Sequence, residues 1–139
     1  MNAAKNYILL AVSVAFFIWF VLKFSPPVWT PLKIAGAAIG APAFLLWVLA
    51  RLRLGASFSL TPQAHELVTR GIYSKIRNPI YVFSSLFILG LILYSGRLAL
   101  LAVFAIILPL QIIRILAEQK VLEAKFGDAY RDYKKRTWF

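Results

Sequence analysis

The sequence predicts an all-α integral membrane protein with four transmembrane helices, a cytoplasmic connecting loop and a cytoplasmic extension of the last helix. Hydrophobic residues make up 61% of the 139 residues, well above the roughly one half that is usual for soluble domains. They fall into blocks close to the roughly twenty residues that a helix needs to cross a bilayer. Basic residues lie mainly between alternate blocks, a pattern typical of membrane proteins.

The apolar blocks are separated by residues that end helices. They run from about Tyr7 to Phe24, Leu32 to Leu52, Ile80 to Tyr94 and Leu98 to Ile115. The proline-rich segment 25–31 ends the first block, because proline cannot continue a helix. Ser95 and Gly96 leave only a tight turn between the third and fourth blocks. The last helix should extend to Phe126, since only Pro109 interrupts it and Gly127 suits a helix end.

The net charge of +11 could indicate a nucleic-acid-binding protein, but the positions of the basic residues favour a membrane topology. If both termini are cytoplasmic, the outer loops hold only three of the 16 Lys and Arg residues, namely Lys23, Lys33 and Arg97. Cytoplasmic loops carry such an excess of basic residues. We therefore predict a multi-pass protein with both termini in the cytoplasm, the lipid bilayer as a partner and no nucleic-acid partner.

The chain is predicted to form a single domain, residues 1–139, with two unequal parts. Residues 1–54 form an amino-terminal transmembrane hairpin, and residues 55–139 form the half in which any chemistry should lie, because polar loops alternate with spans there. Gly36 and Gly40 form a small-residue step that favours close packing with another helix and permits a homodimer. A phosphate-binding glycine loop is the less favoured alternative, because no strand precedes the step and no lysine follows it.

The residue types present limit the chemistry. The chain has no cysteine, one histidine and five acidic residues, which excludes disulfides and thiolate nucleophiles and leaves little for a metal site. We expect no metal.

Polar residues 65–81 and the far end of the last helix should meet on the cytoplasmic side. Asn78 and Pro79 suit the N-cap and first turn of a helix. Alternatively, this helix start could bind a carboxylate, with Arg77 adding charge. Arg114 and Glu118 could form an ordinary ion pair four residues apart. Because charge near hydrocarbon costs at least about 2.5 kcal/mol, we favour a protein-lined cavity that they share with Gln111.

The strings HELVTRGIYSKIRNPIYV and RILAEQKVLEAKFGDAYRDYKKR resemble the isoprenylcysteine carboxyl methyltransferase family and related membrane phospholipid methyltransferases. The shared patterns are H-x-L-V-T-x-G-x-Y, R-N-P-x-Y and an R-x-x-x-E helix that ends in F-G-x-x-Y-x-x-Y.

The resemblance implies a methyltransferase that uses S-adenosylmethionine and acts on the carboxylate of a lipidic or prenylated acceptor. It implies that Glu118 contacts the cofactor and that Arg114 orients the substrate. The other implied cofactor-binding residues are His65, Glu66, Leu67, Val68, Tyr73, Asn78, Pro79, Ile80 and Tyr81.

Other functions remain open. A carboxylate acceptor is ionised at neutral pH and needs alignment rather than a general base. A phospholipid or small molecule methylated on nitrogen would have to lose a proton, for which His65 or Tyr73 is a candidate acceptor; methylation on sulfur is a further alternative. An NADPH-dependent membrane reductase of similar helical arrangement and a non-catalytic scaffold are the remaining alternatives.

Overall fold

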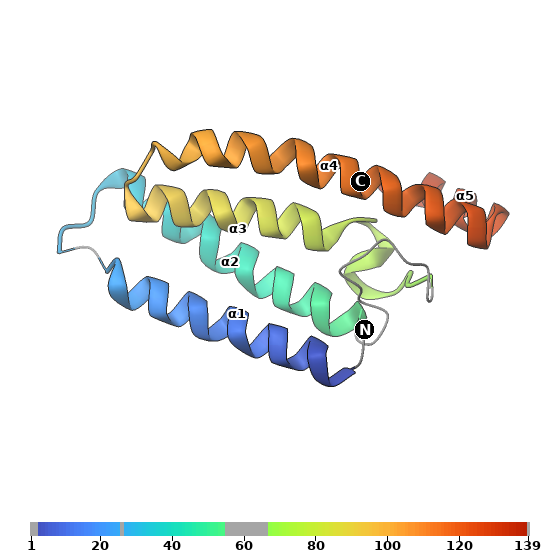
Figure 1. Cartoon of the computed structure of the whole chain (residues 1–139), viewed down its shortest axis with the longest axis horizontal. Coiled ribbons are helices and arrows are strands. Elements are labelled where there is room, and N and C mark those ends of the chain that lie inside the picture. Colours follow the sequence, from blue (N-terminus) through green and yellow to red (C-terminus); the bar gives the residue numbers. More distant parts are fainter. Residues whose placement is uncertain (1–2, 26, 55–66, 139) are drawn as a thin grey trace.

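The computed structural model describes residues 3–25, 27–54 and 67–138, and the regular elements within these ranges are helical (Figure 1). In chain order they are α1 (Ala3–Lys23), α2 (Pro31–Leu54), the 3-10 helix η2 (Gly71–Ser74), α3 (Pro79–Ser95), α4 (Leu100–Phe126) and α5 (Asp128–Arg136). The predicted all-α class is confirmed.

The long helices α1 to α4 lie along the long axis of the molecule, and α5 lies at one end (Figure 1). Two of the described helices, α2 and α4, are long and apolar enough to cross a membrane. The apolar part of α1, Tyr7–Lys23, and helix α3 are shorter. The arrangement with four spans stays a prediction.

The closest helix contact joins α2 to α3 through glycine. A Cβ atom added at Gly90 would lie 2.5 Å from the backbone nitrogen of Gly40, and one added at Gly36 would lie 2.7 Å from the Gly90 carbonyl oxygen. Only residues without a side chain allow backbones to approach this closely. The predicted small-residue step is therefore used within the chain, where α3 covers the surface that we expected to permit a homodimer.

Aromatic side chains attach α1 to this helix pair. The Phe17 ring of α1 stacks on Phe44 of α2, with ring centroids 4.3 Å apart, and meets the edge of Phe87 of α3 at 5.4 Å. Phe44 also lies 4.9 Å from Phe87. This cluster buries large apolar area at the centre of the bundle, where aromatic pairs contribute about 0.5–1.5 kcal/mol beyond area burial.

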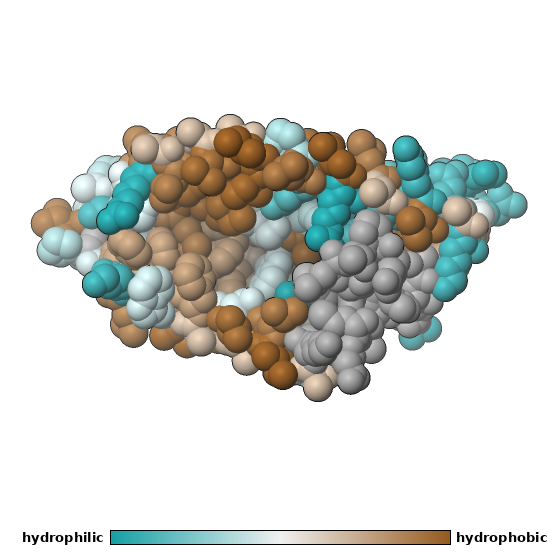
Figure 2. Space-filling model, in the orientation of Figure 1, coloured by the Kyte–Doolittle hydropathy of each residue, from teal (hydrophilic) through white to brown (hydrophobic). Residues whose placement is uncertain are grey.

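Helix α4 presents an apolar outer face. Ile106, Leu110 and Ile113 are each more than half exposed, and Figure 2 shows apolar surface along α4 and hydrophilic residues at the end that carries α5. Exposed apolar surface of this extent is expected where a helix contacts lipid or another protein.

The ends of α3 and α4 follow the sequence signals. Gly96 ends α3 in the left-handed conformation, with φ of 72°. Gly127, with φ of 50°, ends α4 and donates its N–H to the Glu123 carbonyl oxygen at 2.9 Å. Pro42 and Pro109 lie inside continuous helices and do not end them.

Candidate active site

Helix α5 folds back onto the segment that precedes α3. The Tyr133 hydroxyl donates to the Tyr73 carbonyl oxygen at 2.6 Å, and the Trp138 N–H donates to the Lys75 carbonyl oxygen at 2.9 Å. Arg77 Nη1 donates to the Lys134 carbonyl oxygen at 3.2 Å. These bonds hold the start of α3, and thus the residues on its first turns, in a fixed position relative to the end of α4.

Burial raises the pKa of two tyrosines in this contact. Burial raises the pKa of Tyr133 to about 12, and the neighbouring Tyr130 adds to the effect. Burial also raises the pKa of Tyr73, and the nearby Tyr133 and Glu118 raise it further. The Tyr73 hydroxyl lies 3.4 Å from the Ala50 carbonyl oxygen of α2, to which it donates. Both phenols therefore stay protonated beyond the pH at which free tyrosine ionises, and their hydroxyls donate hydrogen bonds that join the elements at this end of the bundle.

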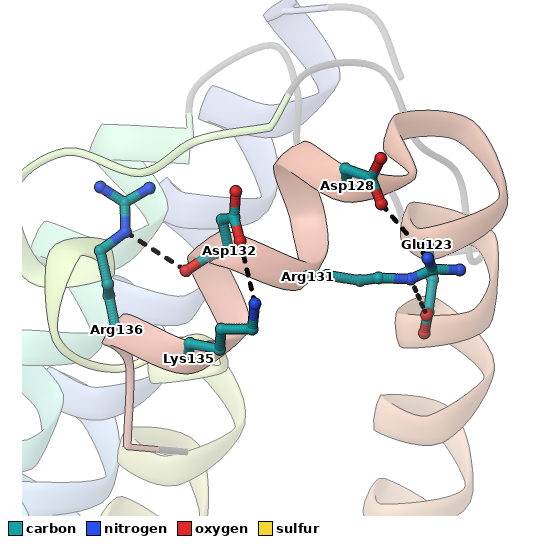
Figure 3. Close-up of polar contacts among 6 residues, drawn as sticks. All are labelled: Glu123, Asp128, Arg131, Asp132, Lys135 and Arg136. Atoms are coloured by element: carbon teal, nitrogen blue, oxygen red, sulfur yellow. Dashed lines mark hydrogen bonds and ion pairs between the residues drawn. The ribbon is translucent and has the colours of Figure 1, made fainter.

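An exposed ion pair joins α5 to the end of α4, and a second pair lies within α5 (Figure 3). Arg131 Nε lies 3.0 Å from the Glu123 carboxylate, and Arg131 Nη1 lies 3.2 Å from Asp128. Because exposed pairs of this kind contribute about 0–1 kcal/mol, the buried tyrosines are the main attachment of α5.

Asn78 occupies the predicted N-cap position of α3, but its side chain makes no capping hydrogen bond. Its backbone conformation, with φ of −120° and ψ of 51°, lies outside the extended region usual for N-caps. The Asn78 carbonyl oxygen accepts the N–H groups of Tyr81 and Val82 at 3.1 Å each. The side-chain capping that we expected is therefore not observed, and Pro79 is fully buried beside it.

Tyr81, Arg114 and Glu118 form one polar cluster between α3 and α4. The Tyr81 hydroxyl donates to Glu118 Oε1 at 2.5 Å, and Arg114 Nε lies 3.4 Å from the same oxygen. The Arg114 guanidinium carbon lies 6.0 Å from the centre of the Tyr81 ring. Both of these contacts use Oε1 of the carboxylate, and Oε2 has no donor among the described residues.

Arg114 and Glu118 thus form the ion pair that was the less favoured alternative, and they also belong to a larger cluster. The Arg114 side chain is 35% exposed and that of Glu118 is 25% exposed. The two charged side chains are therefore partly shielded from solvent and contact Tyr81, unlike a fully solvated ion pair. Of the three residues expected to share a cavity, Gln111 and Arg114 line a pocket, and Glu118 is not among its lining residues.

The pocket has a volume of about 350 Å³ and lies between α3 and α4. It is lined by Ile80, Tyr81, Ser84, Ile107, Leu110, Gln111 and Arg114. Figure 2 shows the face below α4 to be hollowed. A mostly apolar pocket with a few convergent polar groups is the usual form of a small-molecule site, and this one suits a ligand with a charged head and an apolar body.

Gln111 completes the polar side of the pocket. The Ser85 hydroxyl lies 2.8 Å from Gln111 Oε1 and 2.9 Å from the Tyr81 carbonyl oxygen, and the Ser84 hydroxyl donates to the same carbonyl oxygen at 3.0 Å. Sequence reasoning missed both serines, although two adjacent hydroxyl residues inside an apolar span were a usable signal. It also missed the structural role of Tyr130 and Tyr133, whose aromatic spacing in a strongly polar helix indicated a buried face.

The structure brings together one part of the predicted site. Ile80, Tyr81, Gln111 and Arg114 line the pocket, and Glu118 lies beside them. Leu67 and Val68 are half-buried ahead of η2. His65 and Glu66 lie outside the described residues. In the ranges that the structure describes, no group of three or more His, Cys, Asp or Glu side chains could hold a metal ion.

Comparison with known proteins identifies the family. The family model for phospholipid methyltransferases matches residues 32–129, a range that covers well over half of the chain and contains every residue of the pocket. The chain belongs to the phospholipid methyltransferase family. The resemblance inferred from residues 65–136 is therefore confirmed.

A curated relative supports the same assignment. The chain is 35% identical over 74 residues to the protein-S-isoprenylcysteine O-methyltransferase of Schizosaccharomyces pombe. The aligned segment covers 52% of this chain and 31% of the relative. The match therefore spans about a third of the length of that enzyme.

Proposed function

We propose that this member of the family is an integral membrane methyltransferase that uses S-adenosylmethionine and methylates the carboxylate of a lipidic acceptor. One observation carries the proposal. Arg114, paired with Glu118 and held against Tyr81, lines a mostly apolar pocket between α3 and α4. A guanidinium at the edge of such a pocket is suited to an amphiphile with an anionic head.

Two polar side chains, those of Glu118 and Asn78, suit the methyl donor. Glu118 Oε2 has no donor among the described residues, and the Asn78 amide makes no capping bond. A carboxylate complements the cationic groups of S-adenosylmethionine, and an amide can bind its polar edges. The bound donor would supply an electrophilic methyl group on a sulfonium.

The remaining donor contacts rest on the family resemblance. It assigns His65, Glu66, Leu67, Val68 and Tyr73 to one side of the donor and Pro79, Ile80 and Tyr81 to the other. Of these, Tyr73 and Pro79 are buried in the protein, so we propose that they shape the site through packing.

Arg114 would hold the acceptor carboxylate by paired N–H donors. A carboxylate is already ionised at neutral pH, so methylation needs alignment of its oxygen and no general base. The apolar lining at Ile80, Ile107 and Leu110 would contact the hydrocarbon part of the acceptor. Removal of water from this region strengthens the electrostatic hold on the head group.

The membrane topology follows from the same proposal. We propose four transmembrane helices with both termini cytoplasmic, which places α5 and Glu118 on the side where a water-soluble donor is available. The pocket extends from this end between α3 and α4, so the acceptor would enter from the bilayer.

Methylation of a phospholipid amine is the second candidate, because the matching family model is that of phospholipid methyltransferases. Such an acceptor must lose a proton. Tyr73 is a poor proton acceptor, because its hydroxyl donates to Ala50 and is buried. His65, the other candidate proton acceptor, lies outside the described residues, so we favour the carboxylate acceptor because Arg114 lines the pocket.

Two measurements test the proposal. Purified protein in detergent should bind radiolabelled S-adenosylhomocysteine, whereas failure to bind it at millimolar concentration would refute the donor. Membranes supplied with labelled methyl donor should then yield a labelled lipidic product. Loss of the label in mild base indicates a methyl ester, whereas retention indicates N-methylation and would overturn the carboxylate acceptor.

The Arg114→Ala variant separates the two binding functions. It should retain S-adenosylhomocysteine binding and lose most of the base-labile product. Equal product from the variant would remove Arg114 from the acceptor site, and saturation by NADPH in place of the methyl donor would favour a reductase.

A further inference from the structure

The last turn of α5 carries basic side chains that face solvent. Lys134, Lys135 and Arg136 are exposed, and Lys75, in the segment before α3, is also exposed. Lys135 lies 3.3 Å from Asp132, whereas Arg136 Nε donates only to the Asp132 carbonyl oxygen (Figure 3). Lys75, Lys134 and Arg136 have no acidic partner in the described part of the chain. Their positive charge is therefore not compensated by the protein.

Trp138 places an indole ring next to these cations. The residue is 85% exposed, although its N–H donates to the Lys75 carbonyl oxygen at 2.9 Å. Arg77 Nη1 joins the same two segments, because it donates to the Lys134 carbonyl oxygen. The backbone is thus fixed while the ring stays outside the protein. Because single exposed apolar residues are common on soluble surfaces, the meaning of Trp138 depends on its position relative to the membrane.

Helix α4 sets the level of Trp138 relative to a bilayer. It is long and apolar enough to cross a membrane, and its first charged residue is Arg114. Tyr81, on the first turn of α3, donates to Glu118 one turn further along α4. The start of α3 therefore lies where the apolar part of α4 ends, at the level expected for lipid headgroups. Trp138 is bonded to the segment just before that start, and tryptophan is enriched at this level.

The charges of α5 are divided along the helix in the same sense. Asp128, at its first residue, pairs with Arg131, which also pairs with Glu123 of α4. The last three residues, 134–136, are all basic and lead directly to Trp138. The end of α5 that returns to the start of α3 is thus the basic end. A basic surface that also exposes an indole ring at headgroup level is complementary to anionic phospholipid.

We propose that the bilayer binds this surface through its anionic headgroups. The docking surface consists of Lys75, Lys134, Arg136 and Trp138, with phosphate oxygens bound by the cations and the indole ring among the headgroups. Because this surface includes both segments that the Trp138 and Arg77 hydrogen bonds join, bound lipid would also stabilise the contact of α5 with the start of α3. The inference goes beyond the proposed function and uses only the membrane position proposed for α4.

The test measures which lipid surrounds Trp138. Full-length protein is reconstituted in phosphatidylcholine nanodiscs that contain increasing fractions of dibrominated phosphatidylglycerol or of dibrominated phosphatidylcholine, because bromine quenches tryptophan emission on contact. The difference in emission between wild-type protein and Trp138→Phe isolates Trp138 from the other tryptophans. One cation near an anionic surface corresponds to an affinity difference of about fivefold.

We expect phosphatidylglycerol to reach half-maximal quenching of Trp138 at a fraction at least about fivefold lower than phosphatidylcholine does. High salt should reduce this difference, because it screens exposed charges. Equal quenching by the two lipids overturns the inference. Lack of quenching by either lipid places Trp138 away from the bilayer and also overturns it, in favour of a soluble acidic partner such as a nucleic acid or an acidic protein.

Two triple variants with the same change in charge assign the lipid preference. The first removes the cations of the docking surface by the substitutions Lys75→Gln, Lys134→Gln and Arg136→Gln, and it should be quenched equally by the two lipids. The control removes three cations at the opposite end of the long helices (Figure 1) and should keep the preference; its substitutions are Lys23→Gln, Lys33→Gln and Arg97→Gln. A preference that survives in the first variant, or that is lost in the control, overturns the assignment.

The same samples separate this inference from the proposed function. Quenching by brominated phosphatidylcholine should be equal in the wild-type protein and both triple variants, which shows that Trp138 keeps its place at the membrane. Binding of radiolabelled S-adenosylhomocysteine to these nanodiscs reports on the methyl donor alone. Lipid preference without such binding supports the docking surface and refutes the donor, whereas binding without lipid preference refutes the docking surface and leaves the methyltransferase proposal intact.

Discussion

The glycine contact between α2 and α3 gives the sharpest test of the fold. In Gly90→Ala, the added Cβ atom would lie 2.5 Å from the Gly40 backbone nitrogen, whereas ordinary contact begins near 3.4 Å. The helices would have to separate by about 0.9 Å, because the obstacle is backbone and cannot rotate away. Overpacking of this kind costs about 1–3 kcal/mol, and occasionally more.

Gly40→Ala, on the other side of the same contact, is the control for Gly90→Ala. In Gly40→Ala, the added Cβ atom would lie 3.4 Å from the Gly90 Cα atom, which is ordinary contact. Replacing glycine with alanine inside a helix favours the helix by about 0.5–1 kcal/mol. We therefore expect Gly90→Ala to lower the free energy of unfolding by about 1–2 kcal/mol. Gly40→Ala should be neutral or slightly stabilising.

Unfolding of both variants in detergent micelles, followed by tryptophan fluorescence during denaturant titration, measures this difference. Separation of α2 from α3 would also displace the start of α3, so Gly90→Ala should lose affinity for S-adenosylhomocysteine. Gly90→Ala as stable as the wild-type protein, or a loss of equal size in Gly40→Ala, would refute the close backbone contact.

Three further expectations concern the polar contacts. Tyr81→Phe removes the hydroxyl bound to Glu118 and should lower kcat/KM about tenfold or more, as measured by methyl transfer, because bonds to charged groups contribute about 1.5–3 kcal/mol. The folded protein holds the Tyr133 proton more tightly than the unfolded chain, which titrates near pH 10. The contribution of Tyr133 to the free energy of unfolding should thus be complete below that pH and be lost as the pH rises through about 12. The difference in absorbance at 295 nm between wild-type protein and Tyr133→Phe, followed against pH, measures the ionisation of Tyr133. Ionisation near pH 10 would contradict its burial. Glu123→Gln, which breaks an exposed ion pair, should change the unfolding free energy by less than about 1 kcal/mol. A larger loss in denaturant titration would show that this ion pair is a main attachment of α5.

The sequence predicted much of the helix arrangement because its signals are local. Proline before α2 and α3, and glycine after α3 and α4, mark helix ends through backbone restrictions that act at single positions. The end of α4 at Phe126 was predicted from Gly127 and from the lack of interruptions other than Pro109, and it agrees with the structure. The step at Gly36 and Gly40 was also recognised as a packing surface, but its partner was not identified, because spacing along one helix does not indicate which helix will cover it.

The candidate site was predicted in part. Arg114 and Glu118 were recognised because charges in an apolar helix need a physical reason. Asn78 was given a capping role that its side chain does not perform, because the backbone conformation at that position depends on how α5 and η2 pack. Ser85 was missed, since its importance arises only from its contact with Gln111 on another helix.

The sequence by itself determined the helical class, the helix ends, the family and the residue types available for chemistry. These properties follow from local backbone preferences, hydropathy and motif spacing, all of which act over a few residues. The tertiary structure decided that α3 covers the glycines of α2, that α5 folds back through Tyr133, and that Tyr81 binds Glu118 across 37 positions. Such contacts depend on the relative placement of whole helices, which many neighbouring side chains determine together.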